Sequence, residues 1–368
     1  MNAAAASSGR LAFADGLRGL AALWVVLFHC SEGGHLERLK AAMPSLASRF
    51  LFDWGHLGVP VFFVLSGYVM MHSVRGLAFT PRFAGRFMLR RLLRLTPPYY
   101  ASILFVVVYS VVKSGLQGSA LEFPSHKMFA AHLLYLQDIL SLGNISSVYW
   151  TLSIEIQFYL AFSALMLSIH WLDPRGEASA RKNIVLGLAT LAALPWAFGL
   201  STVPLYPGGF PSFWYCFMLG LYGSLQSQSS GMRKIFFSFI TVLALFGFAD
   251  GTGFTIAAVC AAGLLYLGEN MKIVRNTLNN RVLQFLGLIS YSLYLIHNQI
   301  TGASAFIFKR LMPPTVFGEL LYLVVTVMIC ILIAYFGYLL VEAPSIMASR
   351  KIRLTTKSIS KDEMRFNR

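Results

Sequence analysis

The sequence predicts an all-α polytopic membrane protein, a bundle of about ten transmembrane helices with both termini in the cytoplasm. Three observations support this fold class. The 368 residues are 57% hydrophobic and only 12% charged, whereas a soluble domain carries about 25% charged residues. Apolar runs of roughly 20 residues, long enough to cross a bilayer as helices, recur along the chain. Basic residues are concentrated in alternate connections between these runs, as in cytoplasmic loops.

The apolar runs define the predicted spans. They lie near residues 13–31, 57–74, 95–113, 151–171, 184–200, 211–226, 235–250, 253–268, 286–308 and 318–341. The short pair of runs around residues 250–253 also fits a single re-entrant hairpin.

The basic residues orient these spans. The connection between the second and third spans holds six arginines and no acidic residue: Arg75, Arg82, Arg86, Arg90, Arg91 and Arg94. The connections after the fourth, sixth and eighth spans are also basic, and this alternation places both termini in the cytoplasm. The net charge of +15 is thereby explained without a nucleic-acid partner. The longest connection on the opposite side, residues 114–150, is predicted to contain a short helix near residues 128–140.

The domain organisation is simple. Residues 1–348 form one transmembrane domain, and residues 349–368 form a basic cytoplasmic tail. No soluble domain is predicted beside them, and the N-terminus lacks the features of a cleaved signal peptide. The four cysteines lie in or beside apolar runs without metal or disulfide spacing, so we expect them to be small buried hydrophobic residues.

Arg18 and His29 are the unusual residues of the first span. They are eleven residues apart, about three helical turns, so they point the same way with roughly 16 Å between them along the axis. An ionisable side chain at mid-bilayer costs roughly 2.5–3.5 kcal/mol on insertion scales and usually faces the protein interior. His29 is either a hydrogen-bonding partner of a neighbouring helix or a general base, and its alignment with Arg18 favours the base.

Arginines recur every four residues ahead of the third span. Arg82, Arg86, Arg90 and Arg94 have this spacing, and Arg91 lies beside them. On a helix these like charges form one stripe and repel unless an anion binds. Guanidinium groups match phosphate. Two interpretations stay open, namely contact with anionic lipid headgroups and a binding site for a phosphorylated cytoplasmic ligand.

The fourth span begins with Trp150 and carries Glu155 about one turn inside. A glutamate at this depth is expected to be paired or functional. It either pairs with an arginine such as Arg18, or it orients a catalytic base or a polar substrate. Trp150 is either an interfacial aromatic residue or a stacking surface for a sugar.

Tyr294 and His297 lie three residues apart in the ninth span, on one helical face. A buried hydrogen-bond cluster and a substrate contact are the alternatives for this pair. The sequence contains no motif for a metal site, a phosphate-binding loop or a nucleophile elbow.

Taken together, these motifs give the chain a resemblance to the acyltransferase 3 family of membrane enzymes. The matching segments are Asp15-Gly-Leu-Arg-Gly19 with His29, Phe63-Val-Leu-Ser-Gly-Tyr68, Arg90-Arg-Leu-Leu-Arg94 through Tyr99, Trp150-Thr-Leu-Ser-Ile-Glu155, Ser290-Tyr-Ser-Leu-Tyr-Leu-Ile-His297 and Val341-Glu-Ala-Pro344. They cover nearly the whole chain in the family's order. Each segment is weak evidence alone, and the set is specific.

The resemblance implies an O-acyltransferase of the bacterial cytoplasmic (inner) membrane, in the stand-alone form without a fused hydrolase-like domain. It implies acyl-CoA, usually acetyl-CoA, as the cytoplasmic donor, and a hydroxyl of an extracytoplasmic saccharide or glycolipid as the acceptor. It implies that Arg18 and His29 form the core motif, and that Arg90, Arg91 and Arg94 form a second motif at the donor site.

The resemblance and the residues together give a working hypothesis. His29, Glu155 and Arg18 are the catalytic residues. Arg86, Arg90, Arg91 and Arg94 bind the donor, and Trp150, Tyr294 and His297 bind the acceptor, without a metal. Direct attack on the thioester and a covalent acyl-histidine both remain open, as do the acceptor, the acyl chain length and the oligomeric state. A secondary transporter or exporter is the rival interpretation, since embedded charges would also suit it.

Overall fold

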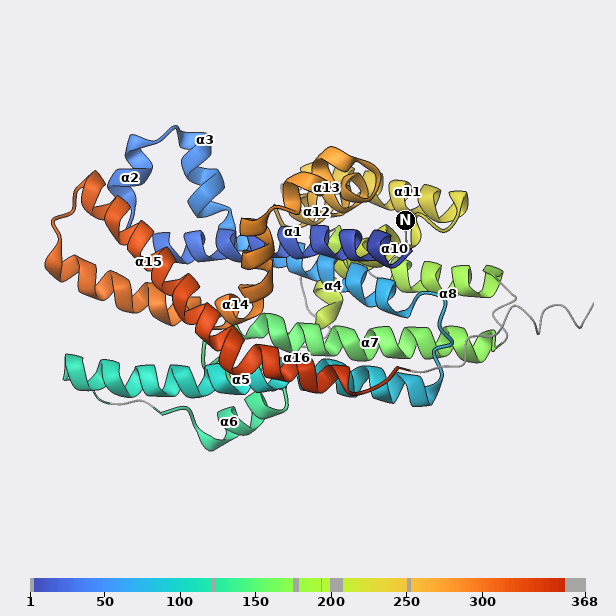
Figure 1. Ribbon diagram of the computed structural model, residues 1–368, viewed down its shortest axis with the longest axis horizontal. Coiled ribbons are helices and arrows are strands. Elements are labelled where there is room, and N and C mark those ends of the chain that lie inside the picture. The colour runs from blue at the N-terminus through green and yellow to red at the C-terminus, as the bar shows by residue number, and fades with distance from the viewer. Residues whose placement is uncertain are drawn as a thin grey trace, which may run out of the picture.

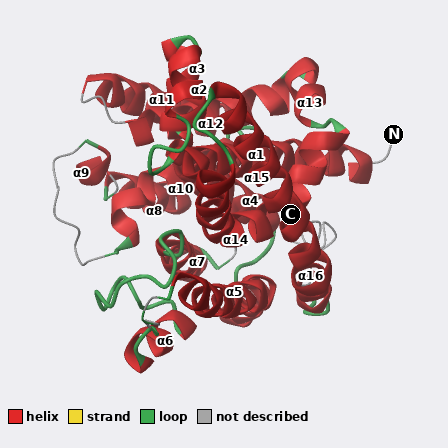
Figure 2. Cartoon of the chain, turned by 90° about the vertical axis from the view of Figure 1, so that its left-hand side faces the viewer, coloured by secondary structure: helices red, strands yellow, loops and turns green. Residues whose placement is uncertain are grey.

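The computed structural model describes residues 3–118, 120, 123–174, 179–192, 194–198, 208–249 and 253–354, and within these ranges the chain is helical without strands (Figures 1 and 2). The longer helices are α1 (Ala3–Ser31), α4 (Gly58–Val74), α5 (Pro81–Gln117), α7 (Trp150–Leu172), α8 (Ser179–Leu191), α10 (Trp214–Leu225), α11 (Ser230–Ala249), α12 (Gly253–Asn270), α14 (Arg281–Leu311) and α15 (Val316–Gly337). The shorter ones are α2 (Glu37–Ala42), α3 (Ser45–Ser48), α6 (His126–Leu133), α9 (Leu194–Ala197), α13 (Lys272–Leu278) and α16 (Ala343–Arg350).

Each predicted span overlaps at least one helix in the described residues, and the protein is a polytopic membrane protein. Seven helical segments are long and apolar enough to cross a bilayer, by length and composition. The other three predicted spans overlap α10, α14 and, at 184–200, two separate short helices, α8 with 13 residues and α9 with 4 residues. The prediction of a full-length span at 211–226 is wrong: α10 has 12 residues, about 18 Å of helix against a hydrocarbon core of about 30 Å. All of its residues are buried, so α10 is an internal helix. α14 is long enough, with 31 residues, but its polar face lowers its hydropathy.

Two predictions reach beyond the described residues. The hairpin alternative at 250–253 and most of the predicted tail, residues 355–368, lie outside them. Before that point, α16 continues through Arg350. The predicted orientation of the termini stays a prediction.

α1 lies at the centre of the bundle, where it packs against α4, α12, α14 and α15 (Figures 1 and 2). Its closest neighbour is α14, and glycines permit the contact. A Cβ on Gly19 would lie 2.6 Å from the backbone nitrogen of Gly287, and a Cβ on Gly287 would lie 2.2 Å from the carbonyl oxygen of Asp15. Because only glycine fits such an approach, the two helices place the neighbours of Gly19 directly against α14.

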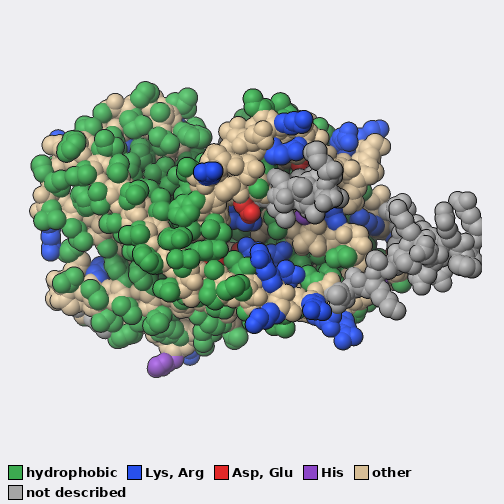
Figure 3. Space-filling model, viewed as in Figure 1, with side chains coloured by type: hydrophobic (Ala, Val, Ile, Leu, Met, Phe, Trp, Pro, Cys, Tyr) green, Lys and Arg blue, Asp and Glu red, His purple; other side chains and the backbone are tan. Residues whose placement is uncertain are grey.

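α5 is one continuous helix that carries both the arginines and the third span. The side chain of Thr80 accepts a hydrogen bond from the amide of Phe83 and caps the helix. The helix has 37 residues, about 55 Å at 1.5 Å per residue. Pro97 and Pro98 lie inside it, just beyond the arginines. On the face seen in Figure 3, basic side chains gather around α16 and the N-terminal half of α5, and the opposite half is mainly hydrophobic. We call this arginine-bearing half the basic end of the bundle.

The connection predicted at residues 114–150 contains a short helix, as expected. This helix is α6. His132 of α6 is fully buried. Its Nδ1 lies 2.7 Å from the hydroxyl of Tyr99, and its Nε2 accepts a hydrogen bond from the amide of Ile145 at 3.1 Å. Burial lowers the pKa of His132 to about 4. This neutral histidine ties the loop before α7 to α5.

Candidate active site

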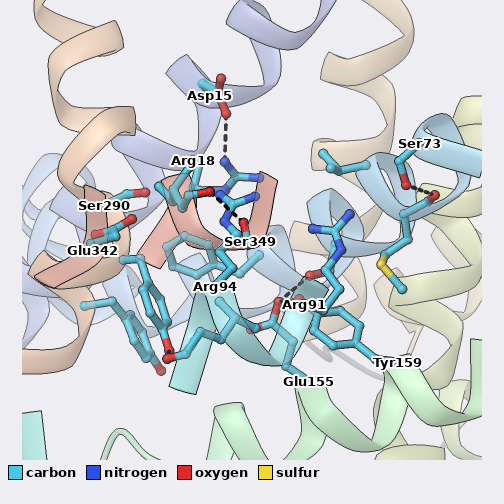
Figure 4. A pocket seen from close by; sticks show the side chains of 18 of the residues that line it. Asp15, Arg18, Ser73, Arg91, Arg94, Glu155, Tyr159, Ser290, Glu342 and Ser349 are labelled. Carbon is cyan, nitrogen blue, oxygen red and sulfur yellow. Dashed lines mark hydrogen bonds and ion pairs between the residues drawn. The ribbon is translucent and has the colours of Figure 1, made fainter. Parts of the chain in front are cut away.

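A cavity of about 660 Å³ lies in the basic end of the bundle, between α1, α4, α5, α7, α14 and α16. Its volume falls within the range of roughly 300–1,000 Å³ that is typical of small-molecule sites. Five arginines and three carboxyl groups line it: Arg18, Arg90, Arg91, Arg94, Arg350, Asp15, Glu155 and Glu342. Figure 4 shows Arg18, Arg91 and Arg94 converging on one space. The cavity therefore presents an excess of guanidinium groups to whatever occupies it.

The arginines of α5 divide into two groups. Arg90, Arg91 and Arg94 line the cavity, whereas Arg86 is not among the lining residues. Residues four apart on a helix differ in direction by about 40°, so Arg86 and Arg94, eight residues apart, differ by about 80°. The two arginines therefore do not face the same cavity. The expectation that Arg86 shares the donor site is not supported by this placement. Arg91 lies over the rings of Phe87 at 5.5 Å and Tyr159 at 5.9 Å, which holds its guanidinium in place.

Arg18 is paired within its own helix. Its Nη1 donates to Oδ1 of Asp15 at 2.7 Å, one turn earlier, and both residues line the cavity. The predicted alternative, a pair between Arg18 and Glu155, does not form. Asp15 was not expected in the site, although its position three residues before Arg18 was the available signal.

Glu155 lies inside the cavity as a hydrogen-bond acceptor. Ser66 Oγ donates to its Oε1 at 2.8 Å, and the hydroxyl of Tyr159 also donates to Oε1 (Figure 4). The prediction that this glutamate is paired or functional agrees with its placement among the arginines. These partners are hydroxyl groups of α4 and α7, so Glu155 does not orient His29 in this conformation.

Another carboxyl group of the cavity, Glu342, is buried, and it belongs to a sequence motif in which it had no assigned role. It is 3% exposed, and its Oε2 accepts hydrogen bonds from the amide of Ser292 at 3.2 Å and from Ser292 Oγ at 2.6 Å. The signal in the sequence was an acidic residue at the end of the most apolar run. Through its bonds to Ser292, Glu342 fixes the part of α14 that lines the cavity.

His29 lies outside the cavity, near the opposite end of α1. Its Nδ1 is 2.5 Å from Oε2 of Glu32, and its side chain is 12% exposed against 52% for Glu32. The imidazole is therefore largely enclosed by the protein, beside a half-exposed carboxylate at the end of α1 opposite the arginines. Glu32 was not predicted as a site residue, although the His-x-x-Glu spacing places it one turn beyond His29.

His297 lies against His29, with 4.9 Å between the ring centroids. Its Nδ1 donates to the carbonyls of Leu293 at 3.1 Å and Tyr294 at 2.8 Å. Its Nε2 is buried, and no partner for it occurs among the described residues. The predicted pairing of Tyr294 and His297 on one face is confirmed, with ring centroids 5.7 Å apart.

Tyr294 connects the cavity with the histidine pair. It lines the cavity, and its hydroxyl lies 2.9 Å from Oγ1 of Thr151 and donates to the carbonyl of Val148 at 3.3 Å. Phe62 also lines the cavity and contacts the Tyr294 ring, with centroids 5.5 Å apart. The arginine-lined space and His29 are thus separated by about one layer of side chains, formed by Tyr294 and His297.

Trp150 does not line the cavity. It packs in an aromatic cluster with Phe63 at 6.4 Å and Phe213 at 5.5 Å between ring centroids. The cavity face of α7 is formed by residues such as Thr151, Glu155 and Tyr159, and Trp150 lies around the helix from that face. The prediction of a direct substrate contact for Trp150 has no support in this arrangement.

Comparisons with known proteins agree with this architecture. The family model described as an acyltransferase domain of the acyltransferase 3 family matches residues 11–335. The chain belongs to the acyltransferase 3 family. No solved structure matches it.

Three curated relatives of this acyltransferase 3 protein show how the similarity is distributed. It is 30% identical to peptidoglycan O-acetyltransferase OatA of Listeria monocytogenes, over 54% of this chain and 30% of that protein. It is 27% identical to regulator of hypoxia-inducible factor 1 of Caenorhabditis elegans, over 52% of this chain and 41% of that protein. It is 26% identical to YrhL of Bacillus subtilis, by name a candidate peptidoglycan O-acetyltransferase, over 90% of this chain and 54% of that protein. The match spans about half or less of each relative.

Proposed function

We propose that this acyltransferase 3 protein is a membrane O-acyltransferase that moves an acyl group, acetyl in the first instance, from acyl-CoA to a hydroxyl of a saccharide. The donor enters from the cytoplasm, and the acceptor lies on the other side of a bacterial inner membrane. The observation that carries the proposal is the arrangement along α1: an arginine-lined cavity includes Arg18 near one end of the helix, and a carboxylate-paired His29 lies near the other end.

The cavity suits the two chemical parts of acyl-CoA. The phosphates of the donor require cationic, fork-shaped partners, which Arg90, Arg91 and Arg94 supply. The pantetheine arm is slender and less polar, and the deeper lining includes Val59 and Phe62. These residues continue toward Tyr294, so an extended arm would bring its thioester toward the histidine pair.

His29 supplies the proton transfer. Because the Glu32 carboxylate accepts the hydrogen on Nδ1, Nε2 of His29 keeps its lone pair and takes the proton of the acceptor hydroxyl. The hydroxyl oxygen bonds to the thioester carbonyl carbon, the carbon–sulfur bond breaks, and the proton passes from Nε2 to the departing thiolate. The products are the saccharide ester and free CoA.

The wall at Tyr294 must move before this reaction. In the present conformation its hydroxyl is tied to Thr151 and Val148, and the cavity stops short of His29. Rotation of the ring breaks these two neutral hydrogen bonds, which contribute about 1 kcal/mol each. Closure of this wall in the resting protein would keep water from the thioester.

The names of two relatives favour a cell-wall glycan as acceptor. The relatives OatA and YrhL carry peptidoglycan O-acetylation in their names, and the half-exposed Glu32 beside the base is compatible with a large acceptor. We therefore propose a saccharide of the cell envelope as the acceptor class.

The test is direct transfer of label. Membranes containing the protein are incubated with acetyl-CoA labelled in the acetyl group, and alkali-labile label on the glycan fraction is counted. Transfer that depends on the protein is expected, and His29→Ala is expected to abolish it while leaving the protein in the membrane. Absence of ester-linked label with the intact protein, or full transfer by His29→Ala, would overturn the proposal.

A further inference from the structure

His29 and Glu32 form a carboxylate–imidazole pair at the end of α1, and the surrounding chain holds it together. The helix ends at Ser31, and the amide of Glu32 donates to the carbonyl of Phe28 at 3.2 Å. Gly33 and Gly34 then adopt φ angles of 73° and 72°, a left-handed conformation that turns the chain away. The backbone of Glu32 is thereby held one turn beyond His29, in reach of its Nδ1.

We propose that Glu32 is the positioning residue of His29. Its carboxylate fixes the tautomer that presents Nε2 as the base, and it stabilises the imidazolium that forms when Nε2 takes the hydroxyl proton. This inference rests on the proposed function and adds a second residue to its chemistry. It also replaces Glu155, for which the sequence suggested this role.

The other groups around His29 do not supply the same charge. His297 of α14 donates its Nδ1 hydrogen to backbone carbonyls, and an imidazole supplies no negative charge to His29. The hydroxyl of Tyr322, on α15, donates to the carbonyl of Cys30. His56, just before α4, contacts the ring of Phe28. Among the described residues, Glu32 is the acidic group within ion-pair distance of His29. The C-terminal end of α1 adds a partial negative charge that also favours an imidazolium.

The size of the effect follows from exposure. Replacing the buried aspartate of a serine-protease triad costs about 10⁴-fold in kcat, whereas the side chain of Glu32 is 52% exposed and its charge is partly screened. We expect Glu32→Gln to lower the rate at saturating acetyl-CoA by roughly 10- to 100-fold, the range found for carboxylates that orient a metal-binding histidine. The KM for acetyl-CoA stays unchanged because Glu32 does not line the donor cavity.

The decisive measurement is the rate as a function of pH. Membranes with their native glycan are supplied with labelled acetyl-CoA, and ester-linked label is followed for wild type, Glu32→Gln, Glu32→Asp and His29→Ala. The acidic limb of the Glu32→Gln profile is expected at lower pH, because a neutral amide stabilises the imidazolium less than a carboxylate. Glu32→Asp keeps the charge, so it retains the wild-type limb with a reduced rate. Glu37→Gln is the matched control: Glu37 is an exposed acid of α2, and this variant should match wild type.

The outcomes separate the two proposals. A Glu32→Gln protein with wild-type rate and pH profile, beside an inactive His29→Ala, overturns the role of Glu32 and leaves the acyl transfer intact. Transfer retained by His29→Ala overturns the transfer chemistry itself. If Glu32→Gln gives less folded protein, measured by its unfolding midpoint in detergent, Glu32→Asp decides: a displaced limb in that charge-retaining variant also overturns the inference.

Discussion

The hydroxyl of Tyr294 lies 2.9 Å from Oγ1 of Thr151, at the boundary between the arginine-lined cavity and the histidine pair. This contact joins α14 to the first turn of α7. It closes the route that the proposed transfer requires, so its strength determines how well the thioester is shielded from water.

Tyr294→Phe should loosen this closure. The variant loses the hydrogen bonds to Thr151 and Val148, each about 1 kcal/mol, so acetyl-CoA hydrolysis without acceptor should rise by roughly 5- to 30-fold. The rate of this hydrolysis is measured as release of free CoA from membranes that lack the glycan. Thr255→Val is the control, because Thr255 makes a similar bond to Tyr215 at 3.2 Å and neither residue lines the cavity. Hydrolysis at the wild-type rate in Tyr294→Phe would contradict the gating role.

Arg90→Gln or Arg94→Gln should weaken donor binding. A lost charge-assisted hydrogen bond costs about 1.5–3 kcal/mol, which corresponds to roughly a 10- to 100-fold higher KM for acetyl-CoA. Arg82→Gln is the matched control, because Arg82 belongs to the same helix but is exposed and does not line the cavity. Equal KM values for all three variants would leave lipid contact as the explanation for the arginines.

Gly19→Ala should destabilise the bundle. Its Cβ would meet the backbone of α14 at 2.6 Å, and backbone cannot move aside as a flexible side chain can. Overpacking of this kind costs about 1–3 kcal/mol or more. The measurement is the thermal unfolding midpoint in detergent, against Gly263→Ala in α12, where an added Cβ meets nothing within 4 Å. Equal midpoints would show that α1 and α14 can separate without cost.

Stability should fall in mild acid because of His132. Its pKa is lowered by burial to about 4, whereas an unfolded histidine titrates near ~6.5. The unfolded chain therefore binds the additional proton between these values, so the contribution is complete above about pH 6.5 and is lost as the pH falls toward 4. Unfolding midpoints across this window should fall less steeply for His132→Gln. His126→Gln, at the exposed start of α6, should follow wild type, and parallel curves for all three proteins would contradict the prediction.

Periodicity and hydropathy located the spans well, because burial in lipid or protein demands apolar runs of defined length. They could not distinguish α10, whose 12 residues are all buried, since an apolar run has the same composition inside a protein as in lipid. The arginine stripe was found from spacing. Spacing did not show that Arg86 lies outside the cavity. Which arginines of the stripe face the cavity depends on where the neighbouring helices lie.

The partners of the ionisable residues were harder to predict. Asp15 and Glu32 lie three residues from Arg18 and His29, so local helical geometry was sufficient to find them. The contact between His29 and His297, and that between Glu342 and Ser292, join residues far apart in the sequence. No local pattern specifies such pairs. The arrangement of Trp150 behind Phe63 likewise depends on packing between helices.

The two prolines in α5 lie between its arginine-bearing part and its second half. Pro97 and Pro98 donate no amide hydrogen, so the carbonyls of Leu93 and Arg94 lose their partners within the helix, and such a site is where helices kink. On one side of this joint stand the arginines, and on the other stands Tyr99, which is anchored through His132. Bending of α5 at these prolines would therefore move Arg90, Arg91 and Arg94 relative to Tyr99 and would change the shape of the arginine-lined cavity.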